Sequence, residues 1–464
     1  MVDSWANSLD LHLDAGSHGT RAAVEAGLRD AVRAGRLPAG TRLPPSRALA
    51  ADLGVARNTV ADAYAQLVAE GWLAARAGSG TWVADRPFPV PAPGTPAGPA
   101  PAAARYDLRP GLPSLAAFPR GPWAAALRKA LGEAPDHVLG YADPRGLLPL
   151  RTALAGYLAR ARGVAAHPDR VVVCGGFANG LALLCEVLRG RGMAAVAVEA
   201  YGHLSHCQIV QAHGLRPVPL TVDAAGARPD ALGRARAAVL TPAHQFPLGV
   251  TLHPSRRRAF CVWAEGSGGL VVEDDYDGEF RYDRQPVGAL QALSPGHVVY
   301  AGTASKSLAP GVRLGWLVVP PSLLDEVVAA KEAAGELAGS LDQLALAQLI
   351  TSGAYDRQVR SARLTYRRRR DLLIAALTRS PVPVRVSGIA AGMHVLAELP
   401  ATMDEAGLVA RAAAHGLAVT GLGSYCDAAT GHAPALVIGY GTPPDHAFTS
   451  ALARLHAVLA ESAA

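Results

Sequence analysis

The first eighty-five residues carry apolar side chains at helical spacing. Val24 and Leu28 would share one face of a helix over residues 20–34, because residues four apart lie on the same side of a helix. A short second helix is predicted after Ser46, its expected N-cap, and a third opens at Arg57. Two short strands around a glycine-rich turn follow. Three helices and a two-stranded wing predict a winged helix-turn-helix.

The third helix of this segment begins with a polar edge. Arg57, Asn58 and Thr59 lie opposite the face formed by Val60 and Tyr64. Arginine and asparagine can make paired hydrogen bonds to base edges in a major groove, so this edge is a candidate DNA-reading surface. The alternative is a winged helix that binds another protein.

A proline-rich stretch follows the winged segment. Residues 86–104 carry a proline at nearly every second or third position, which excludes a helix or a central strand. Such a segment is an extended, semi-stiff spacer. We therefore expect a DNA-binding domain at residues 1–85, a linker at residues 86–104 and a second domain at residues 105–464.

Beyond the linker, short apolar runs alternate with helical stretches. Strands are predicted at residues 170–174, 195–198, 237–240 and 270–273. This alternation predicts an α/β domain whose mostly parallel sheet is covered on both faces. Sites in such sheets lie past the carboxyl ends of the strands.

Composition adds limits to this picture. The 464 residues exceed what one core accommodates, and the net charge of +6 is compatible with nucleic acid without establishing it. Five scattered cysteines lack metal-ligand spacing, and their odd number argues against a disulfide framework. Neither a signal peptide nor a membrane-spanning run is found, so we expect a cytoplasmic protein.

The candidate chemistry centres on Lys306. It lies in a loop of small and hydroxyl-bearing residues between two apolar strands. A lysine in a desolvating pocket can form a Schiff base with an aldehyde. Thr303, Ser305, Ser307 and Arg313 could donate to phosphate oxygens. This set suits pyridoxal 5′-phosphate (PLP), and the alternative is an ordinary surface lysine.

Further candidates follow other strands. Gly175 and Gly176 precede a helix whose N-terminus could bind phosphate. Tyr201 could stack on a flat ring, although a buried structural tyrosine is equally consistent. Residues 273–277 supply acids that are costly to bury without partners, and one carboxylate could keep a pyridine nitrogen protonated. The alternative for these acids is a divalent-metal site.

The N-terminal segment resembles the GntR family of bacterial regulators. The resemblance is carried by the runs at residues 40–50, 53–60, 70–72 and 78–81. It implies that Arg47, Arg57, Asn58 and Thr59 face DNA and that Gly78 lies in the wing near the minor groove. Ala56 departs from the family pattern, which usually has Ser or Thr there, and should remove a helix cap.

The rest of the chain resembles fold-type I aminotransferases, and the two parts in this order resemble the MocR group of regulators. The motifs are Tyr141-Ala-Asp143-Pro144, Gly176-Phe-Ala-Asn179, Tyr201, His244-Gln-Phe-Pro247, Asp274-Asp-Tyr276 and Ser305-Lys306 with Arg313. The resemblance implies a seven-stranded, mostly parallel sheet, a smaller C-terminal α+β subdomain and a head-to-tail homodimer.

Residue roles follow from the resemblance. Lys306 would form the internal aldimine with PLP. Asp274 would contact the pyridine nitrogen, although Asp275 points to the opposite face of the strand and stays an alternative. Tyr276 would contact the ring hydroxyl, and Tyr201 would stack on the ring. Tyr141 would reach the partner subunit's site. The residues that would surround the phosphate are Gly176, Phe177, Ala178, Thr303, Ser305 and Arg313.

Three anchoring positions depart from an aminotransferase. Val437 stands where the arginine for a substrate carboxylate is expected, His203 replaces a second arginine, and Phe246 replaces an asparagine. We therefore expect a transcriptional regulator without physiological turnover that senses PLP itself, as PdxR-like members of the MocR group control vitamin B6 genes. Alternatives are a regulator that senses an amine or amino acid, a working aminotransferase with a fused DNA-binding domain, and a structural scaffold.

Overall fold

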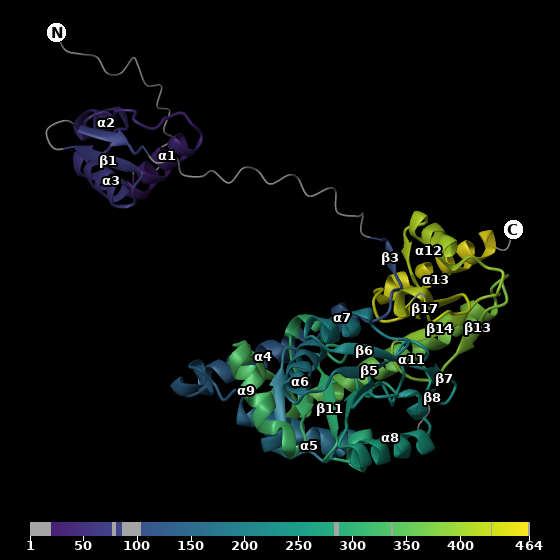
Figure 1. The fold of residues 1–464 in the computed structure, drawn as a ribbon. Helices are drawn as coiled ribbons and strands as arrows, with labels where there is room; N and C mark the ends of the chain where they lie inside the picture. The colour runs from purple at the N-terminus through teal and green to yellow at the C-terminus, as the bar shows by residue number, and fades with distance from the viewer. Residues whose placement is uncertain are drawn as a thin grey trace, which may run out of the picture. The chain divides into compact units, whose positions relative to one another are not determined.

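The computed structural model describes residues 20–76, 80–85, 104–282, 287–335, 337–427 and 429–462. The chain divides into two compact units, residues 1–103 and 104–464 (Figure 1). Among the described helices, none combines the length and the apolar character that crossing a bilayer requires.

The first unit is a winged helix-turn-helix. Thr20 caps its first helix by accepting a hydrogen bond from the Ala23 amide at 3.3 Å. Ser46 is not a cap, contrary to the sequence prediction, because Pro45 holds the cap position and Ser46 is already helical. The elements are α1 (Arg21–Arg33), α2 (Ser46–Asp52), α3 (Arg57–Ala69), β1 (Leu73–Arg76) and β2 (Gly80–Val83).

The apolar face predicted for these helices forms the core of the first unit. Val24, Leu28, Val60 and Leu67 are at most 1 % exposed and belong to one cluster. Strands β1 and β2 pair antiparallel next to it. The helical spacing in the sequence therefore located the buried side of each helix correctly.

The second unit contains a seven-stranded sheet in the order β4-β12-β11-β10-β9-β5-β6. All neighbouring strands are parallel except β12, which runs antiparallel between β4 and β11. The mostly parallel α/β fold is thus confirmed. The strands are β4 (Val171–Cys174), β5 (Ala195–Glu199), β6 (Arg216–Leu220), β9 (Ala237–Leu240), β10 (Leu270–Asp274), β11 (Val298–Thr303) and β12 (Gly315–Val318).

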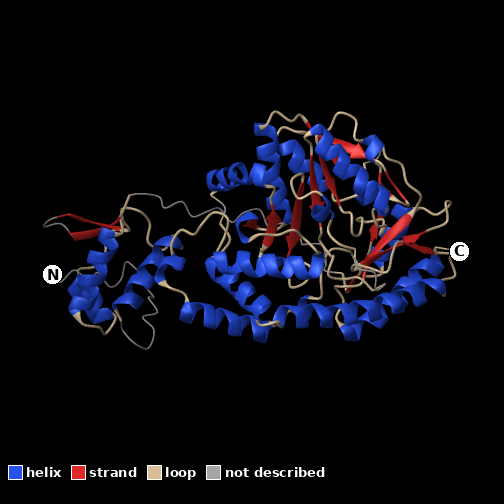
Figure 2. Ribbon diagram, turned by 90° about the horizontal axis from the view of Figure 1, so that it is seen from below, coloured by secondary structure: helices blue, strands red, loops and turns tan. Residues whose placement is uncertain are grey.

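Helices cover both faces of this sheet (Figure 2). Along β4, Val171 and Val173 pack into one core and Val172 and Cys174 into another, as the period of two in a strand requires. The helices of this part are α4 (Arg120–Glu133), α5 (Leu148–Arg162), α6 (Phe177–Gly190), α7 (Leu204–Ala212), α8 (Pro254–Ser267), α9 (Leu324–Ala334) and α10 (Ser340–Thr351).

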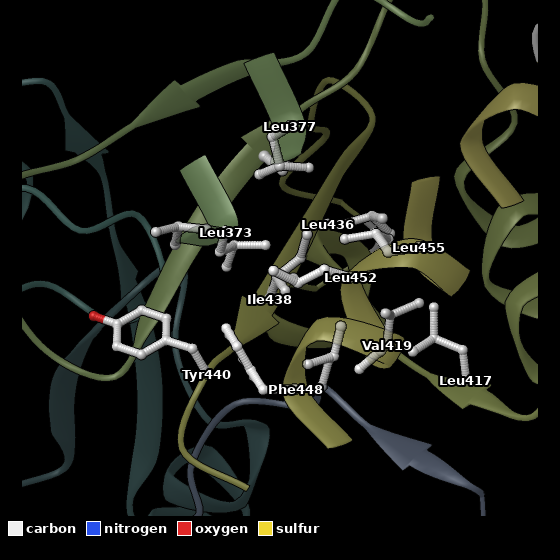
Figure 3. Close-up of a cluster of buried hydrophobic side chains, with 14 of the residues drawn as sticks. Leu373, Leu377, Leu417, Val419, Leu436, Ile438, Tyr440, Phe448, Leu452 and Leu455 are labelled. Atoms are coloured by element: carbon white, nitrogen blue, oxygen red, sulfur yellow. The ribbon is translucent and has the colours of Figure 1, made fainter. Parts of the chain in front are cut away.

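The long helix α11 (Ala354–Thr378) leads into a smaller α+β subdomain. Its sheet has the order β13-β14-β17-β16, and helices α11 and α13 supply leucines to the core against β17 (Figure 3). The elements are β13 (Arg385–Ser387), β14 (His394–Glu398), α12 (Glu405–Ala414), β15 (Leu417–Ala418), β16 (Thr420–Gly421), β17 (Ala435–Gly439) and α13 (Asp445–Glu461).

The first strand of the second unit joins this smaller subdomain. Strand β3 (Tyr106–Asp107) pairs parallel with β15, more than three hundred residues later in the chain. In Figure 1 it lies beside the yellow C-terminal elements. A two-stranded hairpin of β7 (Val222–Asp223) and β8 (Gly226–Ala227) completes the unit.

Candidate functional site

A cavity opens past the carboxyl ends of the central strands β5, β9, β10 and β11. Eight of the eleven residues that the sequence predicts to bind the cofactor line it together, whereas Gly176, Arg313 and Tyr141 do not. The eight are Phe177, Ala178, Tyr201, Asp274, Tyr276, Thr303, Ser305 and Lys306. The topology therefore brings together residues that are up to 129 positions apart in the sequence.

Lys306 is the amine of this cavity. Its Nζ donates a hydrogen bond to the carbonyl oxygen of Gly111 at 2.6 Å. Burial lowers the pKa of Lys306, while the carboxylates of Asp274 and Asp277 oppose that shift. A lysine that loses its proton more readily than usual is a better nucleophile for a carbonyl carbon.

The structure separates the two neighbouring aspartates of residues 274–275. Asp274 is 6 % exposed and lines the cavity, where burial raises its pKa well above the usual range. Asp275 instead makes a bidentate ion pair with Arg162 at 2.6 and 3.0 Å, and it accepts a hydrogen bond from the Tyr300 hydroxyl at 2.7 Å. Asp274 is therefore the carboxylate available to a ligand.

The other acids of this strand end have partners of their own. Glu273 accepts hydrogen bonds from two backbone amides, and Asp277 contacts His244 Nδ1 at 2.8 Å. Because these side chains diverge, the described residues form no group of three potential metal ligands here or elsewhere. The alternative of a divalent-metal site finds no support in this geometry.

The glycine turn before α6 forms a second side of the site. Gly176 has φ +112°, and a Cβ on Gly175 would lie 3.5 Å from Arg313 Nη2. Arg313 has φ +53°, the one positive φ among the described residues other than glycine. Backbone strain of this kind is kept where the surroundings demand a particular orientation, here a guanidinium beside a helix N-terminus.

One hydroxyl of the lysine loop differs from the prediction. Thr303 and Ser305 line the cavity and are hydrogen-bonded to each other at 2.9 Å. Ser307 is buried and points to the Tyr355 hydroxyl at 2.7 Å, so it is not a phosphate donor. The loop turns at residue 307, so the Ser307 side chain points towards the helices that cover the sheet. The sequence did not reveal this turn.

Aromatic rings form the wall next to the lysine. The imidazole of His203 stacks on Phe246 with ring centres 4.4 Å apart and planes 13° from parallel. Burial lowers the pKa of His203 to about 4 and that of His206 to about 3, with a further contribution from Lys306. At neutral pH this wall is therefore uncharged.

Several lining residues were missed or given no role from the sequence. His206 follows His203 by one helical turn on α7, a spacing that could have identified it. Glu199 and Thr241 are held together by a hydrogen bond of 2.5 Å, and burial raises the pKa of Glu199 to about 7. Tyr141, in contrast, is fully exposed and does not line this cavity.

Two family models match the chain. The first, bacterial regulatory proteins of the gntR family, matches residues 20–83, and the second, aminotransferase class I and II, matches residues 118–425. The pyridoxine biosynthesis transcriptional regulator PdxR of Corynebacterium glutamicum is 33 % identical over 92 % of this chain and 93 % of its own. The chain belongs to the MocR group of GntR-family regulators.

Other similar proteins agree with both halves of this MocR architecture. The probable rhizopine catabolism regulatory protein MocR of Rhizobium meliloti is 33 % identical over 82 % of this chain and 81 % of its own. The kynurenine aminotransferase of Pyrococcus horikoshii is 25 % identical, with a TM-score of 0.69, over 78 % of this chain and 92 % of its own. The second unit therefore has the fold of PLP-dependent aminotransferases.

The residues in and beside this MocR-type cavity fit PLP, the cofactor of the fold. A partly desolvated lysine, a buried carboxylate beside it and an arginine at a glycine-rich helix N-terminus suit an aldehyde, a pyridine nitrogen and a phosphate respectively. Lys306, Asp274 and Arg313 would hold these three groups.

The residues predicted to face DNA lie on α2 and α3 of this MocR-type regulator. Arg57 and Asn58 are exposed at its first turn, Thr59 is half-buried, and Arg47 is exposed on α2. Ala56 holds the cap position of α3 without a side-chain hydrogen bond, as its departure from the family pattern implied. Gly78 lies outside the described residues.

Proposed function

We propose that this protein is a transcriptional regulator that senses PLP held by Lys306 and controls vitamin B6 genes, without physiological enzymatic turnover. The observation that carries the proposal is the absence of a carboxylate clamp beside a complete cofactor set. None of the described residues that line the cavity is an arginine, and Arg313 next to it lies at the glycine turn, where it would hold the cofactor phosphate. Val437, at the position of the expected arginine, is fully buried in an apolar cluster that includes Tyr201 and Leu248.

The missing clamp argues against α-amino acids as the ligand. A carboxylate needs charged, oriented donors to hold it in a cavity, and bidentate arginine pairs supply them in amino-acid enzymes. His203 and Phe246 offer instead a neutral, flat wall. When bound, PLP supplies an aldehyde that reacts with primary amines, and in this cavity Lys306 is the amine placed to meet it.

A route from the cavity towards the linker supports a sensing role. We call residues 104–115 the entry segment, because they connect the linker to the second unit. Gly111 in this segment accepts the Lys306 hydrogen bond, and the amide of Ser114 donates to the Tyr366 hydroxyl at 2.9 Å. A covalent bond to an aldehyde would leave the Lys306 nitrogen with fewer protons to donate, and this would weaken its hydrogen bond to the Gly111 carbonyl oxygen.

The proposed assembly is a head-to-tail homodimer that works in the cytoplasm. Tyr141 supports it, since this ring is fully exposed and lies apart from the cavity of its own chain. Two DNA-binding units on one dimer would read two operator half-sites.

The experiment uses absorbance spectra of the full chain with and without PLP, beside gel shifts on DNA from its own promoter. We expect PLP to give a lysine-linked band, trapped by borohydride on the peptide that contains Lys306, and to change operator affinity. Common amino acids should leave the band unchanged. A label on another lysine, or a rapid spectral change with amino acids, would contradict the proposal.

A second candidate function is the sensing of an amine. A further cavity adjoins the first through Val198, Glu199, Gly202 and His203. Its described lining includes the acids Glu199 and Asp427 and neither lysine nor arginine, which suits a cationic side chain. An amine that displaces Lys306 from the cofactor and alters DNA binding would select this function, and sustained keto-acid formation would select an aminotransferase.

A further inference from the structure

Helix α11 carries most of the excess positive charge of the chain. It contains seven arginines and two aspartates, whereas the whole chain has a net charge of +6. Arg357, Arg360, Arg367 and Arg368 are exposed, and we call these four side chains the arginine stripe.

The stripe lies on the side of α11 that faces away from the protein. Tyr355, Val359, Tyr366 and Leu373 face the interior, and at 3.6 residues per turn the stripe falls on the opposite side. Arg369, by comparison, faces inward and holds the Tyr440 and Gly441 carbonyl oxygens. From Arg357 to Arg368 the stripe is about 16 Å long, at 1.5 Å per residue.

The stripe has no counter-charge within the described part of the chain. Arg357 Nη1 reaches only a backbone oxygen at 3.4 Å, and no carboxylate lies within ion-pair distance of the four guanidinium groups. The two aspartates of the helix are engaged elsewhere, Asp356 with Arg160 and Asp371 with Arg370. Between the arginines, Leu364 is 70 % exposed.

Several other arginines of the same unit are paired with a carboxylate. The pairs include Arg191 with Glu326, Arg228 with Asp230, Arg256 with Asp223 and Arg385 with Glu398. On α11, by contrast, four guanidinium groups without a carboxylate partner among the described residues share one face of a single helix. This row provides a site for a polyanion, because each phosphate contact releases condensed counterions.

We propose that the arginine stripe binds the DNA backbone outside the operator half-sites read by the winged helices. Duplex DNA carries one negative charge per about 1.7 Å of axis, so a row about 16 Å long meets several phosphates. Arginine donates to phosphate oxygens in a planar fork and is favoured over lysine in such contacts. The contact is independent of base sequence and strengthens operator binding without changing which operator is chosen.

The proposal rests on the proposed DNA-binding function, and the test separates the two. We compare full-length wild-type protein with a variant carrying Arg357→Gln, Arg360→Gln, Arg367→Gln and Arg368→Gln. The probes are a duplex limited to the operator and one extended by roughly 20 base pairs on each side, about two helical turns. Affinity is measured at several salt concentrations.

A matched control removes the same charge from ion-paired positions. It carries Arg191→Gln, Arg228→Gln, Arg256→Gln and Arg385→Gln, so its net charge equals that of the stripe variant. We expect the stripe variant to bind the long duplex roughly tenfold or more weakly than the control, with a salt slope lower by about 2–4. Both should bind the short duplex alike and bind PLP normally.

Three results would overturn the inference. Equal binding of the long duplex by the two variants would show that only net charge matters. If the stripe variant loses the same affinity for the short and the long duplex, the stripe does not contact the DNA that flanks the operator. Dissociation of the dimer in sedimentation would make the stripe a subunit contact. If the wild type binds neither duplex, the regulator function itself fails.

Discussion

The amine of Lys306 and the carbonyl oxygen of Gly111 are joined by a hydrogen bond of 2.6 Å between positions 195 residues apart. Gly111 belongs to the entry segment, and Leu108 in the same segment is completely buried in the core of the smaller subdomain. The cavity lysine, the smaller subdomain and the chain that comes from the linker are therefore connected through a few contacts.

Replacing Lys306 with alanine should abolish the lysine-linked absorbance band and the effect of PLP on operator affinity. Operator binding without PLP should remain, because the winged helix is a separate compact unit. Spectra and gel shifts measure both effects. Lys129→Ala is the control, since this lysine is exposed and pairs with Glu133 in the same helix. A persisting band in the Lys306 variant would place the covalent site elsewhere.

Displacing the entry segment should alter signalling more than cofactor binding. A Cβ on Gly439 would lie 2.4 Å from the Arg109 carbonyl oxygen, so Gly439→Ala must move one backbone against the other. We expect a loss of about 1–3 kcal/mol of unfolding free energy and a changed PLP dependence of DNA binding. Gly156→Ala is the control, because open space surrounds that position. If operator binding by the Gly439→Ala variant depends on PLP as in the wild type although its entry segment is displaced, the entry segment does not transmit the signal.

Substitutions of the two aspartates at the end of β10 should have different effects, one on stability and the other on cofactor binding. Asp275→Asn leaves Arg162 buried without its carboxylate, which should lower the unfolding free energy by about 3–5 kcal/mol. Asp274→Asn should change stability little and weaken PLP binding strongly. Urea unfolding without cofactor and absorbance titration with PLP measure the two effects. The reversed pattern would show that Asp275 serves the cofactor.

Glu279 should make stability depend on pH. Burial, with help from Asp275, raises its pKa from 4.5 to about 7. The folded state then binds more protons than the unfolded state between these values, so the contribution of Glu279 to stability falls as pH rises through this window, by up to about 3 kcal/mol. Glu279→Gln should remove that fall. Urea unfolding at pH 5 and pH 8 tests this, and parallel pH curves for variant and wild type would refute it.

Arg57→Ala should weaken operator binding by about 1–3 kcal/mol and leave PLP uptake unchanged. The reason is its exposed position at the first turn of α3, where a side chain can reach base edges. Arg21→Ala removes the same charge from α1, where the arginine pairs with Glu25. Equal losses for both variants, measured by gel shift, would indicate a general charge effect in place of a base contact.

Much of the fold followed from local pattern. The run Val171–Cys174 predicted its strand because a strand that is covered on both faces is apolar throughout, and the spacing of Val24 and Leu28 predicted a buried helix face. The choice between Asp274 and Asp275 could not be made from sequence. It depends on Arg162, which lies 113 residues away and approaches only in the folded chain.

The site residues, too, could be predicted from the sequence only where local pattern reveals them. Lys306 and Arg313 are close in sequence, so their shared loop revealed them. Gly111 gave no signal, because its role rests on a backbone carbonyl that any residue possesses. Ser307 was misplaced because the loop turns its side chain towards Tyr355, a partner on α11. Residues that act through backbone atoms or distant partners are therefore found only in the structure.

The pairing of β3 with β15 has a mechanical consequence. Tension along the linker would reach the second unit first at β3, where the amides of Tyr106 and Leu108 donate hydrogen bonds to the Gly416 and Ala418 carbonyl oxygens. A force transmitted through the linker from the DNA-bound first unit would therefore act on the smaller subdomain before it acts on the seven-stranded sheet. Under the proposed sensing function, linkage requires that operator DNA change the affinity for PLP by the same factor by which PLP changes the affinity for the operator.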